Sequence, residues 1–152
     1  MEFTPEKDPG FIPFVLSQIL DTVVTGITLS DPDQPDNPVV YANAAFEMIT
    51  GYGQDEIIGR NCRFLQGEDR DQPEIERIRE ALRTHEPVTV TLRNYRKDGT
   101  LFYNRFTIRP LFDNAGRLIY YLGVQYDVTE QVRAKEELAR LNAILEAAGE
   151  KP

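Results

Sequence analysis

The spacing of apolar residues along the chain predicts several helices. Between residues 12 and 24, apolar side chains recur at intervals of three and four, which places them on one face of a helix. Residues 72–83 repeat this pattern, with Pro73 near the start, where proline suits the first helical turn. Two shorter helical segments, residues 44–50 and 54–58, are separated by glycines.

A further helix is expected over residues 129–148, where the apolar spacing is that of a coiled-coil seam. The seam consists of Ala134, Leu138, Leu141, Leu145 and Ala148, at steps of four and three. A helix of this length is marginal by itself in water, so it needs a surface to dock on. Two alternatives stay open: the helix folds onto its own sheet, or it serves as a dimer contact or output coupler.

Alternating residues rich in Val, Thr and Leu predict three strands in the second half of the chain. Tight turns at residues 96–99, with an Asp-Gly pair, and at 113–116 join these strands, so neighbours run antiparallel. Two shorter strands flank a turn rich in proline and aspartate at residues 31–38. The five predicted strands cover residues 26–30, 39–41, 88–95, 101–109 and 118–128, with Pro110 at the end of the fourth.

Together these elements predict an α+β domain, in which one antiparallel sheet carries short helices on one face. The expected organisation is an N-terminal extension with an amphipathic helix over residues 1–25, a core over 26–128 and a C-terminal helix over 129–152. A length of 152 residues suits one globular domain of this kind.

Composition and charge exclude several functional classes. There are 25 Asp and Glu against 17 Lys and Arg, a net charge of −8, which argues against nucleic acids and anionic membranes as partners. No apolar run approaches the ~18 residues of a membrane span, and the acidic N-terminus is unlike a secretory signal, so a cytoplasmic protein is expected. A single cysteine, Cys62, and a single histidine, His85, leave no internal disulfide and argue against a metal site.

Common catalytic motifs are missing as well. The segment Gly51-Tyr52-Gly53 lacks the third glycine of a dinucleotide-binding loop. The aspartates of residues 31–36 lack the glycine and the closing glutamate of a calcium loop. Because the one histidine lies in a polar link, no Ser/His/Asp set can be assembled, and the chain is not expected to be an enzyme.

The segment Gly59–Gly67 carries the most informative chemistry, because it contains the only cysteine. A lone cysteine is most often a small buried hydrophobe. Its neighbours Asn61, Arg63 and Gln66, however, add two amides and a guanidinium, and Arg79 on the following helix offers a second guanidinium. Two arginines and two amides around one thiol suggest a ligand with a phosphate end and a polar chain.

Three more amides, Asn94, Asn104 and Gln125, lie among apolar strand residues. Buried amides need hydrogen-bond partners, and the edge of a heteroaromatic ring presents both donors and acceptors. These residues therefore predict the polar end of a ring-binding pocket.

The hexapeptide Asn61-Cys62-Arg63-Phe64-Leu65-Gln66 resembles the signature of light-oxygen-voltage (LOV) domains, the flavin-binding photosensors of the PAS superfamily. One departure from the family is Tyr103, where tryptophan is more frequent. The resemblance extends over about two thirds of the chain through Gly26-Ile27-Thr28, Asp36-Asn37-Pro38, Thr50-Gly51-Tyr52, Arg77-Ile78-Arg79, Asn94-Tyr95-Arg96-Lys97-Asp98-Gly99, Phe102-Tyr103-Asn104, Gly123-Val124-Gln125 and Asp127-Val128-Thr129.

This resemblance implies a PAS fold with a five-stranded antiparallel sheet, and FMN held non-covalently in the dark. Cys62 would be the photoactive thiol, whose sulfur bonds reversibly to the flavin C4a carbon under blue light while N5 becomes protonated. By motif position, Arg63 and Arg79 would hold the phosphate, and Asn61 and Gln66 the ribityl chain and phosphate end.

The same resemblance assigns the ring end of the pocket. Asn94 and Asn104 would bind the pyrimidine edge, and Gln125 would contact O4 and N5. The ring would pack against Leu65, Phe106 and Ile108. The segment around Arg70 resembles that of stand-alone bacterial, or short, LOV proteins, in which an extra arginine binds phosphate; the alternative is a solvated loop charge.

The implied signal passes from N5 to Gln125, whose amide both donates and accepts and whose strand leads into the C-terminal helix. The expected partners are a second copy of the chain, through the N- and C-terminal helices, and an effector such as a kinase or cyclase. Two alternatives remain: a light-insensitive flavin redox protein, as a sensor or an enzyme, and a PAS-type module that binds another ligand or a protein.

Overall fold

The computed structural model describes residues 14–149, so residues 12 and 13 of the first predicted helix lie outside the described range. The predicted order of helices and strands is confirmed, and a 3-10 helix at the cysteine is added. The elements are α1 (Phe14–Thr22), β1 (Gly26–Ser30), β2 (Val39–Ala42), α2 (Ala44–Thr50), α3 (Gln54–Ile57), η2 (Cys62–Gln66), α4 (Glu74–Thr84), β3 (Val88–Tyr95), β4 (Leu101–Phe112), β5 (Leu118–Asp127) and α5 (Thr129–Ala147).

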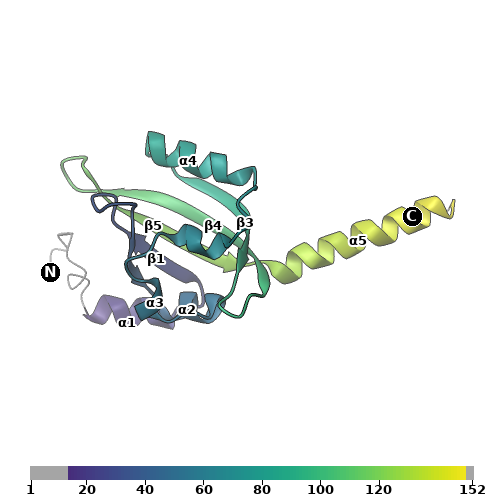
Figure 1. Cartoon of the computed structure of the whole chain (residues 1–152), viewed down its shortest axis with the longest axis horizontal. Helices are drawn as coiled ribbons and strands as arrows, with labels where there is room; N and C mark the ends of the chain where they lie inside the picture. The colour runs from purple at the N-terminus through teal and green to yellow at the C-terminus, as the bar shows by residue number, and fades with distance from the viewer. Residues whose placement is uncertain (1–13, 150–152) are drawn as a thin grey trace.

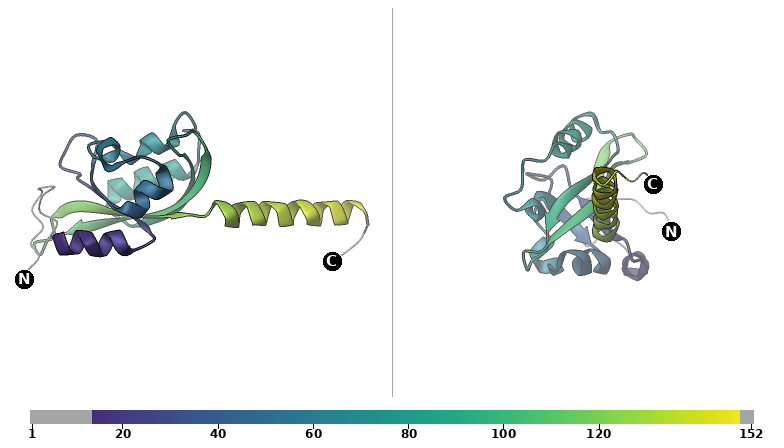
Figure 2. Two further views of the ribbon diagram at one scale, coloured as in Figure 1. Left: turned by 90° about the horizontal axis from the view of Figure 1, so that it is seen from below. Right: turned by 90° about the vertical axis from the view of Figure 1, so that its right-hand side faces the viewer.

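The five strands form one antiparallel sheet in the order β2-β1-β5-β4-β3. The last strand of the chain therefore lies at the centre, between β1 and β4. The helices α2, α3, η2 and α4 cover one face of this sheet, and α1 contacts α2 (Figures 1 and 2). The predicted α+β class, with short helices on one face, is confirmed.

Strand β4 is longer than predicted, because it continues through Pro110 to Phe112. The prediction ended this strand at Arg109, since proline has no N–H to donate to a sheet. In the structure β3 begins at Val88, opposite Ile108, so beyond Ile108 β4 has a neighbour on one side only. Proline is tolerated on such an edge, and Pro110 pairs with Tyr121 of β5.

Asn43 fixes the start of α2 and joins three elements. Its Oδ1 accepts hydrogen bonds from the backbone N–H of Ile27 at 2.8 Å and of Phe46 at 3.1 Å. Its Nδ2 donates to the carbonyls of Leu20 and Thr25, both at 2.9 Å. Because the side chain is fully buried and uses its whole hydrogen-bonding capacity, α1, β1 and α2 are held together at this residue.

Two apolar clusters fill the space between the helices and the sheet. Cys62 packs against the first cluster and Phe106 against the second. The first consists of Val39, Ala42, Phe46, Ile57 and Leu65, and the second of Ile75, Val90 and Leu92. The candidate site takes its walls from both clusters.

Helix α5 touches the domain only near its base and then projects away from it (Figures 1 and 2). At this base the Thr129 hydroxyl accepts a hydrogen bond from the backbone N–H of Tyr103 at 3.0 Å. Along the seam, Leu138 is 60% exposed and Leu141 is 45% exposed. The alternative in which this helix folds onto its own sheet is therefore wrong.

Among the described helices, none has the length and apolar character needed to span a membrane.

Candidate functional site

A cavity with about 640 Å³ of empty volume, its mouth included, lies between the two apolar clusters. Its walls come from η2, α4 and the strands β1, β3, β4 and β5. Ten of the twelve predicted site residues line it: Asn61, Cys62, Arg63, Leu65, Gln66, Asn94, Asn104, Phe106, Ile108 and Gln125. The fold thus collects side chains from both halves of the sequence around one space.

Cys62 is the first residue of η2 and forms part of the cavity wall. Asn61 caps this short helix, since its Oδ1 accepts a hydrogen bond from the backbone N–H of Arg63 at 3.0 Å. The cysteine as a whole is half-buried, but its thiol group is enclosed, and this burial raises the pKa of Cys62 to about 12. At neutral pH the sulfur therefore carries its proton, and the group is a thiol rather than a thiolate.

Two asparagines from neighbouring strands form the polar end of the cavity. Nδ2 of Asn104 donates to Oδ1 of Asn94 at 3.0 Å, and Nδ2 of Asn94 donates to the carbonyl of Arg93 at 2.9 Å. Both asparagines are buried. In this arrangement Oδ1 of Asn104 is left without a hydrogen-bond partner among the described residues.

Gln125 of β5 occupies the neighbouring part of the wall, opposite Phe106 of β4 in the strand register. Its Nε2 donates to the hydroxyl of Thr28 at 3.2 Å. Its Oε1 is buried and, within residues 14–149, has no partner. The cavity therefore contains a second amide oxygen that can accept a hydrogen bond.

Sequence reasoning missed five of the residues that line the cavity: Ser30, Asn37, Ile78, Leu82 and Leu92. Asn37 is the one that adds chemistry, because its buried Oδ1 is a third amide oxygen without a partner in the described structure. Its backbone is left-handed, with φ of 48°. Asparagine tolerates that conformation, so an asparagine before proline in a turn was the available signal.

Arg63 lies at the mouth of the cavity, where it forms an ion pair with Asp36. The backbone carbonyl of the same aspartate accepts a hydrogen bond from Nδ2 of Asn61 at 2.7 Å. Two of the predicted cofactor ligands are thus held by one residue of the β1–β2 turn. The ion pair is solvent-exposed on both sides, which makes it a weak contact that a phosphate group can replace.

The other two predicted phosphate ligands, Arg70 and Arg79, are not among the described residues that line the cavity. Arg79 pairs with Glu76, one turn earlier on α4, and both side chains are exposed. Nε of Arg70 donates to the carbonyl of Gly67 at 3.2 Å. These local contacts keep both guanidinium groups at the surface, and Arg70 belongs to the segment that follows η2.

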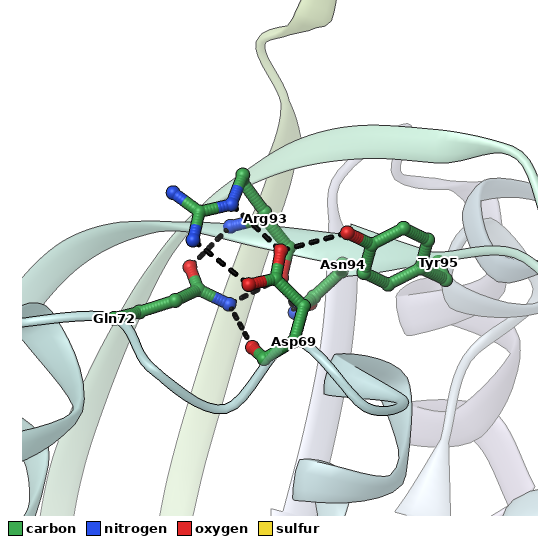
Figure 3. Close-up of polar contacts among 5 residues, drawn as sticks. All are labelled: Asp69, Gln72, Arg93, Asn94 and Tyr95. Carbon is green, nitrogen blue, oxygen red and sulfur yellow. Dashed lines mark hydrogen bonds and ion pairs between the residues drawn. The ribbon is translucent and has the colours of Figure 1, made fainter.

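A hydrogen-bonded network ties that segment to β3 (Figure 3). Arg93 donates from Nε and Nη2 to the two carboxylate oxygens of Asp69, at 2.6 and 2.8 Å, and the Tyr95 hydroxyl donates to the same carboxylate at 2.7 Å. These donors, Arg93 above all, lower the pKa of Asp69 to about 2.

Gln72 completes the network from a buried position. Its Nε2 donates to the carbonyls of Asp69 at 2.7 Å and Arg93 at 3.0 Å, and its Oε1 accepts from the backbone N–H of Arg93 at 2.8 Å. Because Asn94 follows directly and also bonds to the Arg93 carbonyl, the network fixes the strand that presents Asn94 to the cavity.

The chemistry of the cavity wall fits a flavin. Asn37 and Asn104 each present an amide oxygen with no partner in the described residues, so a matching ligand must offer N–H or O–H groups there. A flavin offers both, through the N–H of its ring and the hydroxyls of its ribityl chain. Its apolar ring faces suit side chains such as Leu65 and Phe106. In the described residues, no group of three or more His, Cys, Asp or Glu is placed to hold a metal ion.

Comparison with known proteins agrees with this chemistry. Residues 24–130 match the model of the PAS domain family, so the chain contains a PAS domain. A solved structure that reports a flavin analogue in a LOV domain is 42% identical, with a TM-score of 0.72, and the match covers 87% of this chain and 98% of that one. The chain belongs to the LOV domains, the blue-light sensors of the PAS superfamily, whose chromophore is a flavin.

Two curated relatives carry the same domain within longer proteins. A blue-light photoreceptor of Listeria monocytogenes is 43% identical over 126 residues, which are 83% of this chain and 49% of that protein. Blue-light-activated histidine kinase 1 of Erythrobacter litoralis is 47% identical over 116 residues, 75% of this chain and 32% of the kinase. The chain therefore spans half or less of the length of these two relatives, and in the second the LOV domain is part of an effector enzyme.

Proposed function

We propose that this LOV domain binds FMN and that Cys62 is its photoactive residue. The observation that carries the proposal is an enclosed thiol in the wall of a cavity with three amide oxygens that lack partners in the described residues. When bound, a flavin would supply the absorption of blue light and a ring carbon, C4a, for a reversible bond with the sulfur of Cys62, with the proton of the broken S–H bond going to N5. Because the thiol keeps its proton at neutral pH, the S–H group of Cys62 carries both the sulfur and the proton that this reaction needs.

Three arginines bind the phosphate end of FMN. Arg63 binds the phosphate at the cavity mouth, with Asn61 and Gln66 beside the ribityl chain. Arg79 and Arg70 join it by exchanging their surface contacts for the phosphate, since a doubly charged anion attracts a guanidinium more strongly than a single exposed carboxylate does. This preference for a phosphate favours FMN over riboflavin.

The ring end of the pocket orients the chromophore. Asn94 and Asn104 bind the pyrimidine edge through their amides, and Gln125 lies on the adjacent strand within the same wall. The ring faces pack against Leu65, Phe106 and Ile108. The cofactor thus supplies the photochemistry, and the chain supplies orientation and exclusion of water.

The output runs from Gln125 into the flanking helices. β5 ends at Asp127, two residues after Gln125, and Oδ1 of Asp127 accepts the first backbone N–H of α5, that of Thr129, at 3.0 Å. A rearranged hydrogen bond at Gln125 therefore biases the packing of α5 as a population shift between two states. The exposed seam of α5 supports a homodimer through the terminal helices, and the domain acts on an effector such as a kinase or cyclase rather than as an enzyme itself.

Absorption spectra before and after blue light test the core of this proposal, with wild type, Cys62→Ala and Cys62→Ser reconstituted with FMN. We expect a structured flavin band that bleaches and then returns in the dark in wild type only. The serine variant is the matched control, because it keeps a polar side chain of similar size without the sulfur. A yellow wild type that does not bleach would leave a light-insensitive flavin redox protein, and failure to bind FMN would leave a PAS-type module for another ligand or a protein.

A further inference from the structure

The side chain of Gln125 lies in a space that two glycines leave free. Gly26 is its cross-strand partner, and a Cβ there would lie 3.3 Å from Cβ of Gln125. Gly123 precedes it on the same face of β5, and a Cβ there would lie 2.8 Å from Nε2 of Gln125. The amide can therefore fold back over Gly123 only because that residue has no side chain.

This path leads the amide to Thr28. Thr28 is the cross-strand partner of Gly123, and its hydroxyl accepts the hydrogen bond from Nε2 of Gln125 at 3.2 Å. A Cβ on Gly123 would lie 2.4 Å from that hydroxyl oxygen, which is closer than any real contact. Both Thr28 and Gln125 are almost fully buried, at 4% and 3% exposure, so bulk water does not replace the bond.

A threonine hydroxyl suits this position because it both donates and accepts. With Nε2 of Gln125 toward Thr28, the hydroxyl accepts and Oε1 faces away from it. With the amide reversed, the hydroxyl donates to Oε1 and the NH2 group is the free end. One end of the amide is satisfied in either orientation, whereas an apolar residue at the same place would leave that end buried and unpaired.

We propose that Thr28 is the positioning residue for the Gln125 amide, holding it against β1 in both of its orientations, with Gly123 providing the space. The inference rests on the proposed function, because it concerns the residue through which the flavin signal leaves the cavity. It assigns to Thr28 no contact with the flavin. Thr28 acts through Gln125.

The test is a nuclear magnetic resonance measurement on the isotope-labelled full chain, with and without FMN. The readouts are the chemical shifts and hydrogen exchange of the Gln125 side-chain NH2 group in the dark. In Thr28→Val we expect a change of shift and at least about fivefold faster exchange, the factor that one ordinary hydrogen bond contributes. Thr28→Ser should restore both values, because it restores the hydroxyl.

Two further variants define the controls. Thr91→Val removes a threonine hydroxyl from the opposite face of the sheet, so the Gln125 signals should remain those of wild type. Gly123→Ala places a methyl group where the Gln125 amide and the Thr28 hydroxyl meet, so it should disrupt the same hydrogen bond and reproduce the effect of Thr28→Val. This second variant keeps the test valid if one of the two does not fold. The rate at which the bleached flavin band returns in the dark should change by about fivefold in Thr28→Val and remain unchanged in Thr91→Val.

The inference and the proposed function fail in different ways. Gln125 signals in Thr28→Val that match wild type, in both the FMN-bound and the FMN-free chain, would overturn the role of Thr28 even if the variant bleaches normally. A wild type that binds no FMN or does not bleach would overturn the proposed function. In that case the FMN-free spectra would still show whether the hydroxyl of Thr28 holds the amide.

Discussion

Asn104 and Asn94 are joined side chain to side chain across β3 and β4, although neither is the cross-strand partner of the other. The ladder places Asn104 opposite Leu92 and Asn94 opposite Phe102, whereas Nδ2 of Asn104 reaches diagonally to Oδ1 of Asn94 at 3.0 Å. Diagonal neighbours on one face of a sheet lie within reach of longer side chains. Because the bond uses the side-chain oxygen of Asn94, the oxygen of Asn104 is the one left for a ligand.

Replacing Asn104 by alanine should therefore weaken flavin binding. The substitution removes the acceptor at the cavity and leaves the Asn94 oxygen buried without its donor. We expect the dissociation constant for FMN to rise about tenfold, the equivalent of roughly 1–2 kcal/mol, in a fluorescence titration. Thr91→Ala, on the opposite face of the sheet, is the control and should leave the affinity unchanged. An Asn104→Ala chain that binds FMN as tightly as wild type would remove this residue from the cofactor site.

Asn37 should act on the flavin as well, although no role was assigned to it from the sequence. Asn37→Gly deletes the unpaired amide but keeps the left-handed backbone, which glycine adopts readily. We expect about fivefold weaker FMN binding, with the free energy of unfolding changed by no more than ~1 kcal/mol. The same change at Asn114, an exposed turn residue between β4 and β5, is the matched control. Equal affinities for the two variants would show that the Asn37 amide does not face the ligand.

The contrast between Asn104 and Asn37 shows how far the sequence can be read. Asn104 was predicted because an amide at an inward position of a clear strand must find a partner. Strand alternation and an Asp-Gly turn, both of them local patterns, fix that inward position. Asn37 lies in a turn, where burial depends on which distant segment covers it. Sequence periodicity carries no information about that packing.

Other differences have the same origin. Pro110 ended the predicted strand, yet β4 continues, because proline is acceptable where β4 extends past its pairing with β3 and forms an edge. The hydrogen bond from Gln125 to Thr28 depends on the alignment of β1 with β5. The two residues are 97 positions apart in the sequence. Such pairings follow from topology, whereas the helix and strand patterns are local.

The network around Asp69 predicts a defined acid sensitivity. The Arg93 guanidinium, with help from the Tyr95 hydroxyl, lowers the pKa of Asp69 in the folded chain from the ordinary 3.8 to about 2. A carboxylate with a lowered folded-state pKa stabilises the fold above its unfolded-state pKa, and this stabilisation is lost as the pH falls through the folded-state value. Stability should thus decline between about pH 4 and pH 2, and Asp69→Asn should remove this part of the decline.

Urea unfolding at a series of pH values between 6 and 2 (roughly the window in which carboxylates titrate) measures this effect. Asp71→Asn is the matched control, because Asp71 is an exposed carboxylate in the same loop. The wild type and the control should lose stability in parallel, with Asp69→Asn less stable at neutral pH but flatter at low pH. A variant that retains the wild-type acid profile would show that the Asp69–Arg93 pair does not contribute.

The exposed seam of α5 should decide the oligomeric state. Leu138 and Leu141 are 60% and 45% exposed, so replacing both by glutamate puts charges into a helix–helix contact without disturbing the core. We expect a wild-type dimer to become a monomer by light scattering, while the free energy of unfolding of the monomer changes by less than about 1 kcal/mol. Ala143→Glu, on the opposite face of the same helix, adds charge outside the seam and should leave the dimer intact. A dimer that survives in the double variant would place the interface on another surface, away from α5.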